Sequence, residues 1–281
     1  MSATKPLIHL ISQTNWEWDE LNSAQNYEVV KSFGLEVPSY VDNDSWRIPQ
    51  EPYTHFMLSG ARMPVEAPGP LWLDGVPDEL KQRSVATLTA KEVLNMVNDP
   101  HAFWKFAEAK SNEFIAQPYS LEYVKDFISS NKVPSDSFMQ FSGHIEIVNE
   151  YRFFVVYGEV VASSLYVSHD EQGNSQTIYD GAIVDTQELK QATRFIVDAL
   201  SQLDIPDSLV IDVAKTKKGF AILEANPSWC SGWYNCEINS VAKAIYVSNR
   251  VNISSKWLYK PDALLIDKFN KRRPLKINNV N

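Results

Sequence analysis

Two acidic residues and an asparagine in the last third of the chain have the types and spacing of a metal site. Apolar runs on either side of a Lys-Lys-Gly segment predict an antiparallel hairpin over residues 208–226. A turn centred on Lys218 puts Asp212 directly opposite Glu224. Asn226 shares the face of Glu224, because side chains alternate along a strand. Three oxygen-bearing side chains would then lie together.

The apolar surroundings of this acidic pair suggest what it binds. On the predicted register the opposite face of the hairpin carries Leu209, Ile211, Val213, Ala221, Leu223 and Ala225. The face of the pair also carries Val210, Ala214, Phe220 and Ile222. Two facing carboxylates in such a place repel each other and lose hydration. A divalent cation offsets both penalties, and hard oxygen ligands suit Mg²⁺ that bridges to phosphates.

Other interpretations of the hairpin remain open. Asp212 could pair with a lysine and Glu224 with a backbone turn, which would make both residues structural. The register also depends on the turn, since one extra turn residue would move Asp212 to the other face.

The same segments resemble the end of an ATP-grasp domain. The resemblance is carried by Val210-Ile-Asp-Val-Ala214, by the hairpin, and by Leu223-Glu-Ala-Asn-Pro-Ser-Trp229. It implies that Asp212, Glu224 and Asn226 hold the magnesium ions of bound ATP.

Two lysines extend the resemblance. ATP-grasp proteins use two lysines from two strands to contact the nucleotide phosphates, and Lys105 and Lys110 match these positions. The chain departs from the family pattern in two features. Phe106 stands where a proline usually follows the first lysine, and residues 107–112 contain no glycine.

A strand with the sequence Glu150-Tyr-Arg-Phe-Phe-Val155 also matches the family. Arg152 lies on the same strand face as Glu150, and its planar guanidinium suits a phosphate or carboxylate because it donates two parallel hydrogen bonds. The resemblance implies that Arg152 binds the transferring phosphate and that Glu150 contacts the ribose or orients Arg152. It also implies that adenine lies near Phe138–Ser142. The structural alternative is an interior ion pair of Arg152 with Glu150 or Glu224.

The function implied by the resemblance is an ATP- and Mg²⁺-dependent ligase. Such an enzyme joins a carboxylate to an amine through an acylphosphate, here on an amino acid, a peptide or a peptide-like substrate. Lys105 and Arg152 would be its catalytic residues. An ATP-dependent phosphotransferase on the same fold and a non-catalytic nucleotide-binding module are the alternatives.

An aromatic segment follows the hairpin and has two interpretations. It consists of Trp229, Cys230, Ser231, Gly232, Trp233, Tyr234 and Cys236. In ATP-grasp proteins this loop borders the acceptor site, whereas its composition also fits a hydrophobic plug under the last helix. Zinc is not expected, because the two cysteines lack neighbouring histidines.

Composition limits the remaining possibilities. The chain has 281 residues, of which 44% are hydrophobic and 22% charged, which is typical of globular proteins. A formal charge of −9 disfavours nucleic acid as a partner. The only early apolar run, 7–11, is too short for a signal peptide, and no run reaches the roughly 18 residues of a membrane span. We expect a cytoplasmic protein that does not bind membranes, and its oligomeric state stays open.

The expected fold class is α+β, with antiparallel sheets in two subdomains that sandwich ATP. A segment rich in proline and glycine between residues 62 and 77 indicates a linker. The resemblance covers about residues 86–260. We therefore divide the chain into a small α/β N-terminal domain (1–85) and an ATP-grasp domain (86–281). The second comprises subdomains 86–141 and 142–260 and a basic tail, 261–281.

Local patterns predict the main elements. Helices are expected at 24–33, 120–131 and 239–248, after Thr186, and after a capping box formed by Thr89 and Glu92. Strands are expected at 7–12, 35–41, 54–59, 101–106, 113–117, 137–147, 150–157, 159–167, 208–216 and 220–225.

Overall fold

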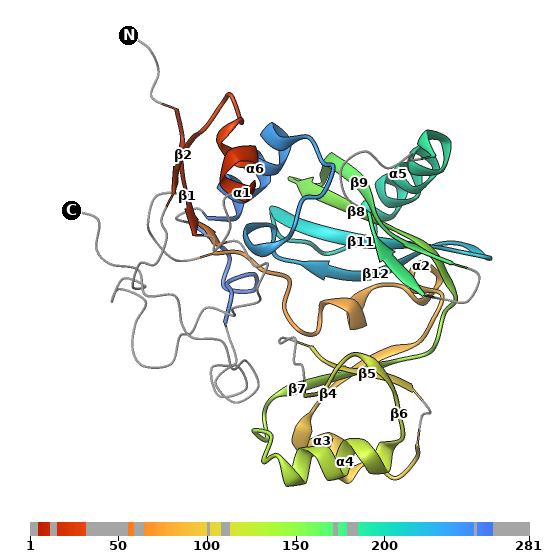
Figure 1. The fold of residues 1–281 in the computed structure, drawn as a ribbon. Coiled ribbons are helices and arrows are strands. Elements are labelled where there is room, and N and C mark those ends of the chain that lie inside the picture. Colours follow the sequence, from red (N-terminus) through yellow and green to blue (C-terminus); the bar gives the residue numbers. More distant parts are fainter. Residues whose placement is uncertain are drawn as a thin grey trace.

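A five-stranded antiparallel sheet forms the centre of the computed structural model (Figure 1). The structure describes residues 5–11, 16–31, 56–58, 65–99, 102–107, 113–170, 174–178, 185–249 and 252–260. The sheet has the strand order β10-β9-β8-β11-β12, so β12 lies at an edge. Its strands are β8 (Ile147–Val156), β9 (Glu159–His169), β10 (Ser175–Thr177), β11 (Ser208–Thr216) and β12 (Gly219–Asn226).

Helices cover both faces of this sheet. They are α5 (Thr186–Leu200) and α6 (Ile238–Ser248). Adjacent residues of β8, Phe153 and Phe154, are both fully buried, the first in the core under α5 and the second in the core under α6. Because neighbouring side chains on a strand point to opposite faces, the centre of the sheet is enclosed on both sides.

A second sheet, at the bottom of Figure 1, has four antiparallel strands in the order β4-β7-β5-β6. Its strands are β4 (Val85–Thr89), β5 (Ala102–Phe106), β6 (Gln117–Tyr119) and β7 (Phe138–Ser142), and its helices are α3 (Ala90–Asn95) and α4 (Leu121–Ser130). Trp104 is fully buried between sheet and helices. The predicted capping box is confirmed: the Thr89 hydroxyl accepts from the Glu92 backbone N–H, and the Glu92 carboxylate accepts from that of Thr89.

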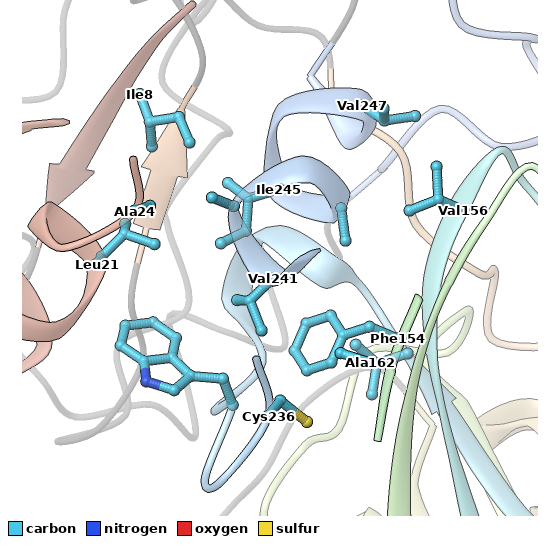
Figure 2. Packing of buried hydrophobic residues seen from close by; sticks show 14 of the residues in the cluster. Ile8, Leu21, Ala24, Phe154, Val156, Ala162, Cys236, Val241, Ile245 and Val247 are labelled. Carbon is cyan, nitrogen blue, oxygen red and sulfur yellow. The ribbon is translucent and has the colours of Figure 1, made fainter. Parts of the chain in front are cut away.

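A small three-stranded unit at the N-terminal end packs on α6. It contains β1 (Leu7–Ile11), α1 (Trp16–Asn22), β2 (Glu28–Lys31) and β3 (Phe56–Leu58), with β1 and β2 parallel. Figure 2 shows Ile8 and Leu21 of this unit facing Ile245 of α6, while Phe154 of the central sheet lies on the other side of the helix. The helix α6 therefore joins the N-terminal unit to the central sheet.

The helix predicted at 24–33 is wrong. The observed helix, α1, ends before Ser23, whose hydroxyl donates to the Glu20 carbonyl. Part of the predicted helix is β2, because consecutive β-branched valines favour extended backbone and β1 offers a pairing partner. The strand predicted at 35–41 lies outside the described residues.

Other boundaries differ more modestly. The strand predicted at 137–147 is two strands, since β7 ends at Ser142 and β8 begins at Ile147 in the other sheet. The strand predicted at 113–117 is β6, displaced toward the C-terminus. The N-cap of α5 is Asp185, whose carboxylate accepts from two backbone N–H groups, and Thr186 is the first helical residue. The α+β class with antiparallel sheets is confirmed.

The segment between the N-terminal unit and the small sheet runs beside the edge strand β12. It forms η2 (Trp72–Gly75) and α2 (Asp78–Lys81) and leads directly into β4. The domain division that we proposed after residue 85 thus falls at the start of β4. No helix within the described residues is long and apolar enough to cross a membrane.

The core around α6 yields a stability prediction. Ile245→Ala removes a fully buried side chain from the contact between the N-terminal unit and the central sheet. Large-to-small changes of this kind cost about 2–5 kcal/mol, so the free energy of unfolding in urea should fall by that amount. Val197→Ala on α5 is the control, because Val197 is 52% exposed. Equal losses for both variants would contradict the described packing.

Candidate functional site

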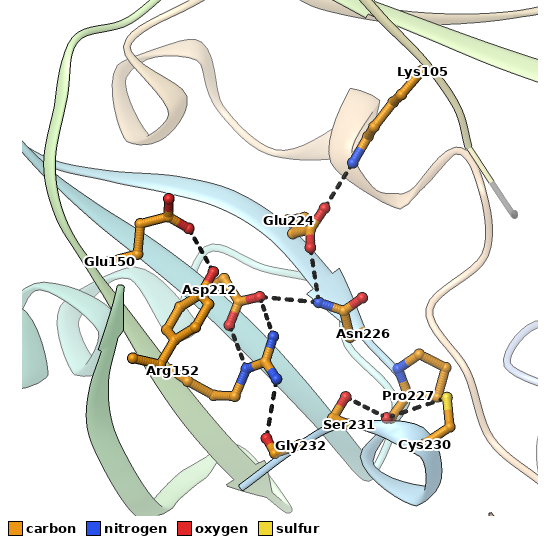
Figure 3. A network of polar contacts seen from close by, with 11 residues as sticks. Lys105, Glu150, Arg152, Asp212, Glu224, Asn226, Pro227, Cys230, Ser231 and Gly232 are labelled. Atoms are coloured by element: carbon orange, nitrogen blue, oxygen red, sulfur yellow. Dashed lines mark hydrogen bonds and ion pairs between the residues drawn. The ribbon is translucent and has the colours of Figure 1, made fainter. Parts of the chain in front are cut away.

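A row of charged residues crosses the middle of the central sheet. Arg152 of β8 is paired with Asp212 of β11, and Asp212 is paired with Glu224 of β12. Asn226 lies two residues further along β12, on the same side (Figure 3). The structure therefore confirms the predicted placement of Asp212 opposite Glu224.

The route to this register differs from the predicted one. The turn contains only Lys217 and Lys218, and pairing starts at Thr216 with Gly219. A register shift between Asp212 and Val213 then adds one residue to β12, which is a β-bulge at Leu223. The shorter turn and the bulge compensate each other, so the acidic pair still faces across the strands.

The compensation changes the faces of the residues between the turn and the bulge. Phe220 and Ile222 were expected beside the acidic pair, but they pack with Val213 in the core under α5. Leu223 was expected on that apolar face, but it lines a cavity together with Glu224. Ala221, also expected on the apolar face, is paired with Ala214, which shares the face of Asp212. These assignments were wrong because alternation is interrupted at a bulge.

Arg152 and Asp212 form a buried ion pair. The Nε and Nη2 atoms of Arg152 donate to Oδ1 and Oδ2 of Asp212 at 2.9 and 2.8 Å, and Nη1 donates to the Gly232 carbonyl at 3.0 Å. Asp212 has no exposed surface, and Arg152 is 8% exposed. Burial acts to lower the pKa of Arg152, but the Asp212 carboxylate outweighs it and holds that pKa well above its usual value. Arg152 thus forms an interior ion pair, and its partner is Asp212 rather than the expected Glu150 or Glu224.

Two aromatic rings enclose the guanidinium. Tyr166 and Tyr234 place their ring centroids 4.7 and 5.3 Å from the Cζ atom of Arg152. Such contacts stabilise a cation that has lost water. Burial, followed by the charges of Asp212 and Glu150, raises the pKa of Tyr166 well above its usual value, so this phenol stays protonated.

Glu224 is neutralised from the other sheet. The Nζ atom of Lys105, on β5, lies 2.7 Å from Oε2 of Glu224, and the two side chains are 27% and 32% exposed. Asn226 donates through Nδ2 to Asp212 at 3.1 Å and to Glu224 at 3.2 Å. Lysine therefore pairs with Glu224, not with Asp212 as the structural interpretation had it. All three predicted metal ligands belong to one hydrogen-bonded set.

This donor set fits Mg²⁺. It offers two carboxylates and an amide oxygen, and Mg²⁺ is commonly held by one or two carboxylates together with substrate phosphates and water. Among the described residues no group of three or more His, Cys, Asp or Glu side chains could hold a metal. A metal at this position would therefore depend on Asn226 and on ligands from outside the protein.

A cavity of about 950 Å³ lies between the two sheets. Its walls include Lys105 of β5, Gln140 of β7, Glu150 of β8 and Glu224 of β12. The volume is at the upper end of the roughly 300–1,000 Å³ of small-molecule sites. The predicted Lys105, Glu150 and Glu224 thus face one cavity. Lys110 lies outside the described residues.

Glu150 has partners that the sequence did not reveal. The Tyr166 hydroxyl donates to its Oε2 at 2.5 Å, and Nε2 of His169 lies 2.9 Å from its Oε1. All three side chains line the cavity. The pairing of β8 with β9 brings them together, and a tight turn at Gly158 was a signal for that pairing, although bulges obscure the register.

Arg83 was missed altogether. It lies just before β4 and lines the cavity, and its guanidinium donates to the backbone carbonyls of Ile222, Leu223 and Lys81 at 2.9–3.1 Å. Burial lowers the pKa of Arg83, while the charge of Glu224 raises it. No sequence pattern pointed to a link between this arginine and the hairpin.

The aromatic segment after β12 supports the structural interpretation in part. Trp229, in the short helix η3 (Ser228–Cys230), and Trp233 are both 1% exposed, and their indole N–H groups donate to the Glu66 carbonyl and the Glu20 carboxylate. Burial raises the pKa of Cys236 to about 12, so its thiol is unreactive. Gly232 and Tyr234 instead contact Arg152, as described above.

The fold and site together define an ATP-grasp protein. A family model of the ATP-grasp domain, family 3 of one clade of these domains, matches residues 51–245, which is more than half of the chain. This chain therefore belongs to that family and has the ATP-grasp fold. At the superfamily level, membership indicates ATP-dependent ligase chemistry. No curated protein matches the sequence.

Solved ATP-grasp structures resemble the chain only distantly. D-alanine–D-alanine ligase from Bacillus anthracis in complex with ATP has 13% identity and a TM-score of 0.30 over 56% of this chain and 50% of that chain. The ATP-grasp ligase PsnB with a minimal precursor has 14% identity and a TM-score of 0.35 over 63% and 57%. The Bacillus anthracis ligase in another crystal structure has 10% identity and a TM-score of 0.42 over 95% and 97%. The chain spans about half the length of the first two.

The buried ion pair yields a second stability prediction. Asp212→Asn leaves the Arg152 charge buried without its counter-ion, which costs about 3–5 kcal/mol. We expect a loss of that size in the free energy of unfolding of the metal-free protein, measured with urea. Glu224→Gln is the control: Glu224 and Lys105 are each about a third exposed, and such pairs contribute about 1 kcal/mol or less. Similar losses in both variants would contradict the ion pair.

Proposed function

We propose that this protein is an ATP- and Mg²⁺-dependent ligase that joins a carboxylate to an amine through an acylphosphate. The substrate is an amino acid, a peptide or a peptide-like compound. The observation that carries the proposal is the joining of Asp212, Glu224 and Asn226 into one polar set at the cavity between the two sheets. Lys105 reaches that set from the opposite sheet.

The cavity walls support an assignment for each part of ATP. Adenine would lie against Gln140 and the backbone between β7 and β8, which line one end of the cavity. Glu150 would accept from the ribose hydroxyls, with Tyr166 and His169 fixing its orientation. The phosphates would extend toward Lys105 and Glu224.

Asp212, Glu224 and Asn226 would hold Mg²⁺. When bound, the metal supplies positive charge that screens the phosphate oxygens. Lys105 now neutralises Glu224, so the nucleotide complex would give each of these two groups a new partner of opposite charge. Lys105 would then contact the phosphates and hold them in place.

The reaction needs positioning and charge neutralisation more than covalent work by the protein. The terminal phosphate of ATP would pass to the substrate carboxylate, and ADP would leave. The amine would attack the acyl carbon of the acylphosphate and release inorganic phosphate with formation of an amide. A direct contact of Arg152 with the transferring phosphate stays a prediction, because its described hydrogen bonds go to Asp212 and Gly232.

Product analysis tests the proposed function. The purified protein is incubated with ATP, Mg²⁺ and pooled amino acids and short peptides, and ADP, phosphate and products are measured. A ligase gives ADP and phosphate only when carboxylate and amine are both present, with a product mass equal to both substrates less water. A phosphorylated product without free phosphate would indicate a phosphotransferase. ATP binding without turnover across the pools would contradict the proposal.

Replacement of Lys105 tests the placement of the nucleotide. Lys105→Ala should weaken ATP binding by about 1.5–3 kcal/mol, the usual range for a hydrogen bond to a charged group, and leave AMP binding nearly unchanged. Calorimetric titration with each nucleotide measures both effects. Lys190→Ala on α5 is a control that changes the net charge equally, outside the residues that line the cavity. An equal loss for ATP and AMP would place Lys105 away from the phosphates.

A further inference from the structure

The β-bulge at Leu223 decides whether the metal site exists. From Thr216 to Val213 the pairing of β11 with β12 follows one register, in which Val213 faces Ile222. If that register continued, Leu223 would face Asp212. Glu224 would then point to the apolar core under α5, since a slip of one residue reverses the faces of a strand. The extra residue prevents this outcome.

Two side chains hold the outer edge of β12. Arg83 donates through Nη1 to the Ile222 carbonyl at 3.0 Å and through Nη2 to the Leu223 carbonyl at 2.9 Å. Gln82 donates to the Phe220 carbonyl at 2.9 Å. Both residues follow α2, and Nη1 of Arg83 also binds the Lys81 carbonyl at the end of that helix, so the guanidinium is fixed from behind.

The Arg83 contacts mark the bulge itself. In a regular strand the carbonyls of consecutive residues point to opposite edges, so one side chain cannot reach both. Ile222 and Leu223 are consecutive, yet both bind one guanidinium. Arginine suits this task because its planar fork has several N–H groups in fixed directions, whereas lysine offers a single nitrogen.

We propose that Arg83 is a positioning residue for the metal site, and that it acts by holding the bulge that places Glu224 opposite Asp212. The inference rests on the proposed function, because it assigns Arg83 a part in metal binding. Arg83 also lines the cavity, so direct contact with a phosphate is the competing explanation. The two differ in whether the need for Arg83 depends on the bulge.

The test measures Mn²⁺ affinity by electron paramagnetic resonance in the presence of a non-hydrolysable ATP analogue. Loss of a group that orients a metal ligand typically costs about 10–100-fold in metal affinity, and we expect that loss for both Arg83→Met and Arg83→Lys. Gln82→Met is the matched control: it removes a contact to the same edge before the bulge, and Mn²⁺ affinity should stay close to that of the wild type. Melting temperatures of the two Met variants should fall to a similar extent.

Deletion of Leu223 separates the two explanations. In the deleted chain an uninterrupted register brings Glu224 opposite Asp212 without a bulge. Mn²⁺ binding should persist, and Arg83→Met should cause no further loss in that background. An equal loss with and without Leu223, or full Mn²⁺ affinity in Arg83→Lys, would overturn the inference and favour a charge that contacts phosphate. If the deleted chain does not fold, the Arg83→Lys result decides alone.

Failure of the proposed function gives a different result. If the wild-type protein with the ATP analogue binds no Mn²⁺, the metal site and the role of Arg83 are both refuted. If the wild type binds Mn²⁺ and Arg83→Met binds it equally well, only the role of Arg83 is refuted.

Discussion

The buried carboxylate of Asp212 is the constraint on which the site depends. A charge without exposed surface in the middle of a sheet requires a partner, and Arg152 supplies one with two parallel hydrogen bonds. The guanidinium in turn needs the Gly232 carbonyl and the rings of Tyr166 and Tyr234. The loop after β12 is thereby fixed against the sheet, which explains why aromatic residues gather there.

Charge balance extends from this pair to the opening between the sheets. Asn226 connects Asp212 to Glu224, and Lys105 completes the series from the small sheet. One buried pair and one half-exposed pair thus share a hydrogen-bonded set. The inner pair maintains the protein structure, whereas the outer pair can exchange partners at low cost because water reaches it. A site of this kind can admit a metal and phosphates without loss of the fold.

Sequence reasoning succeeded where the determining interactions are local or repeat along a strand. Alternation placed Asp212, Glu224 and Asn226 on one side, and the capping box at Thr89 depends only on neighbouring residues. It failed where distant elements decide. The helix expected at 24–33 became β2 because β1 is beside it, and the partner of Arg152 depends on the register of three strands. The bulge could not be predicted, since a shorter turn hides its effect on the acidic pair.

The central claim is that Asp212, Glu224 and Asn226 form the metal site of an ATP-grasp nucleotide complex. A crystal structure of the protein with Mg²⁺ and a non-hydrolysable ATP analogue tests it most directly. We expect Mg²⁺ bound to oxygens of these three side chains and of the phosphates, the Lys105 ammonium moved from Glu224 to a phosphate, and adenine beside Gln140. Nucleotide outside the cavity between the sheets, or Mg²⁺ held without Asp212 and Glu224, would contradict the account.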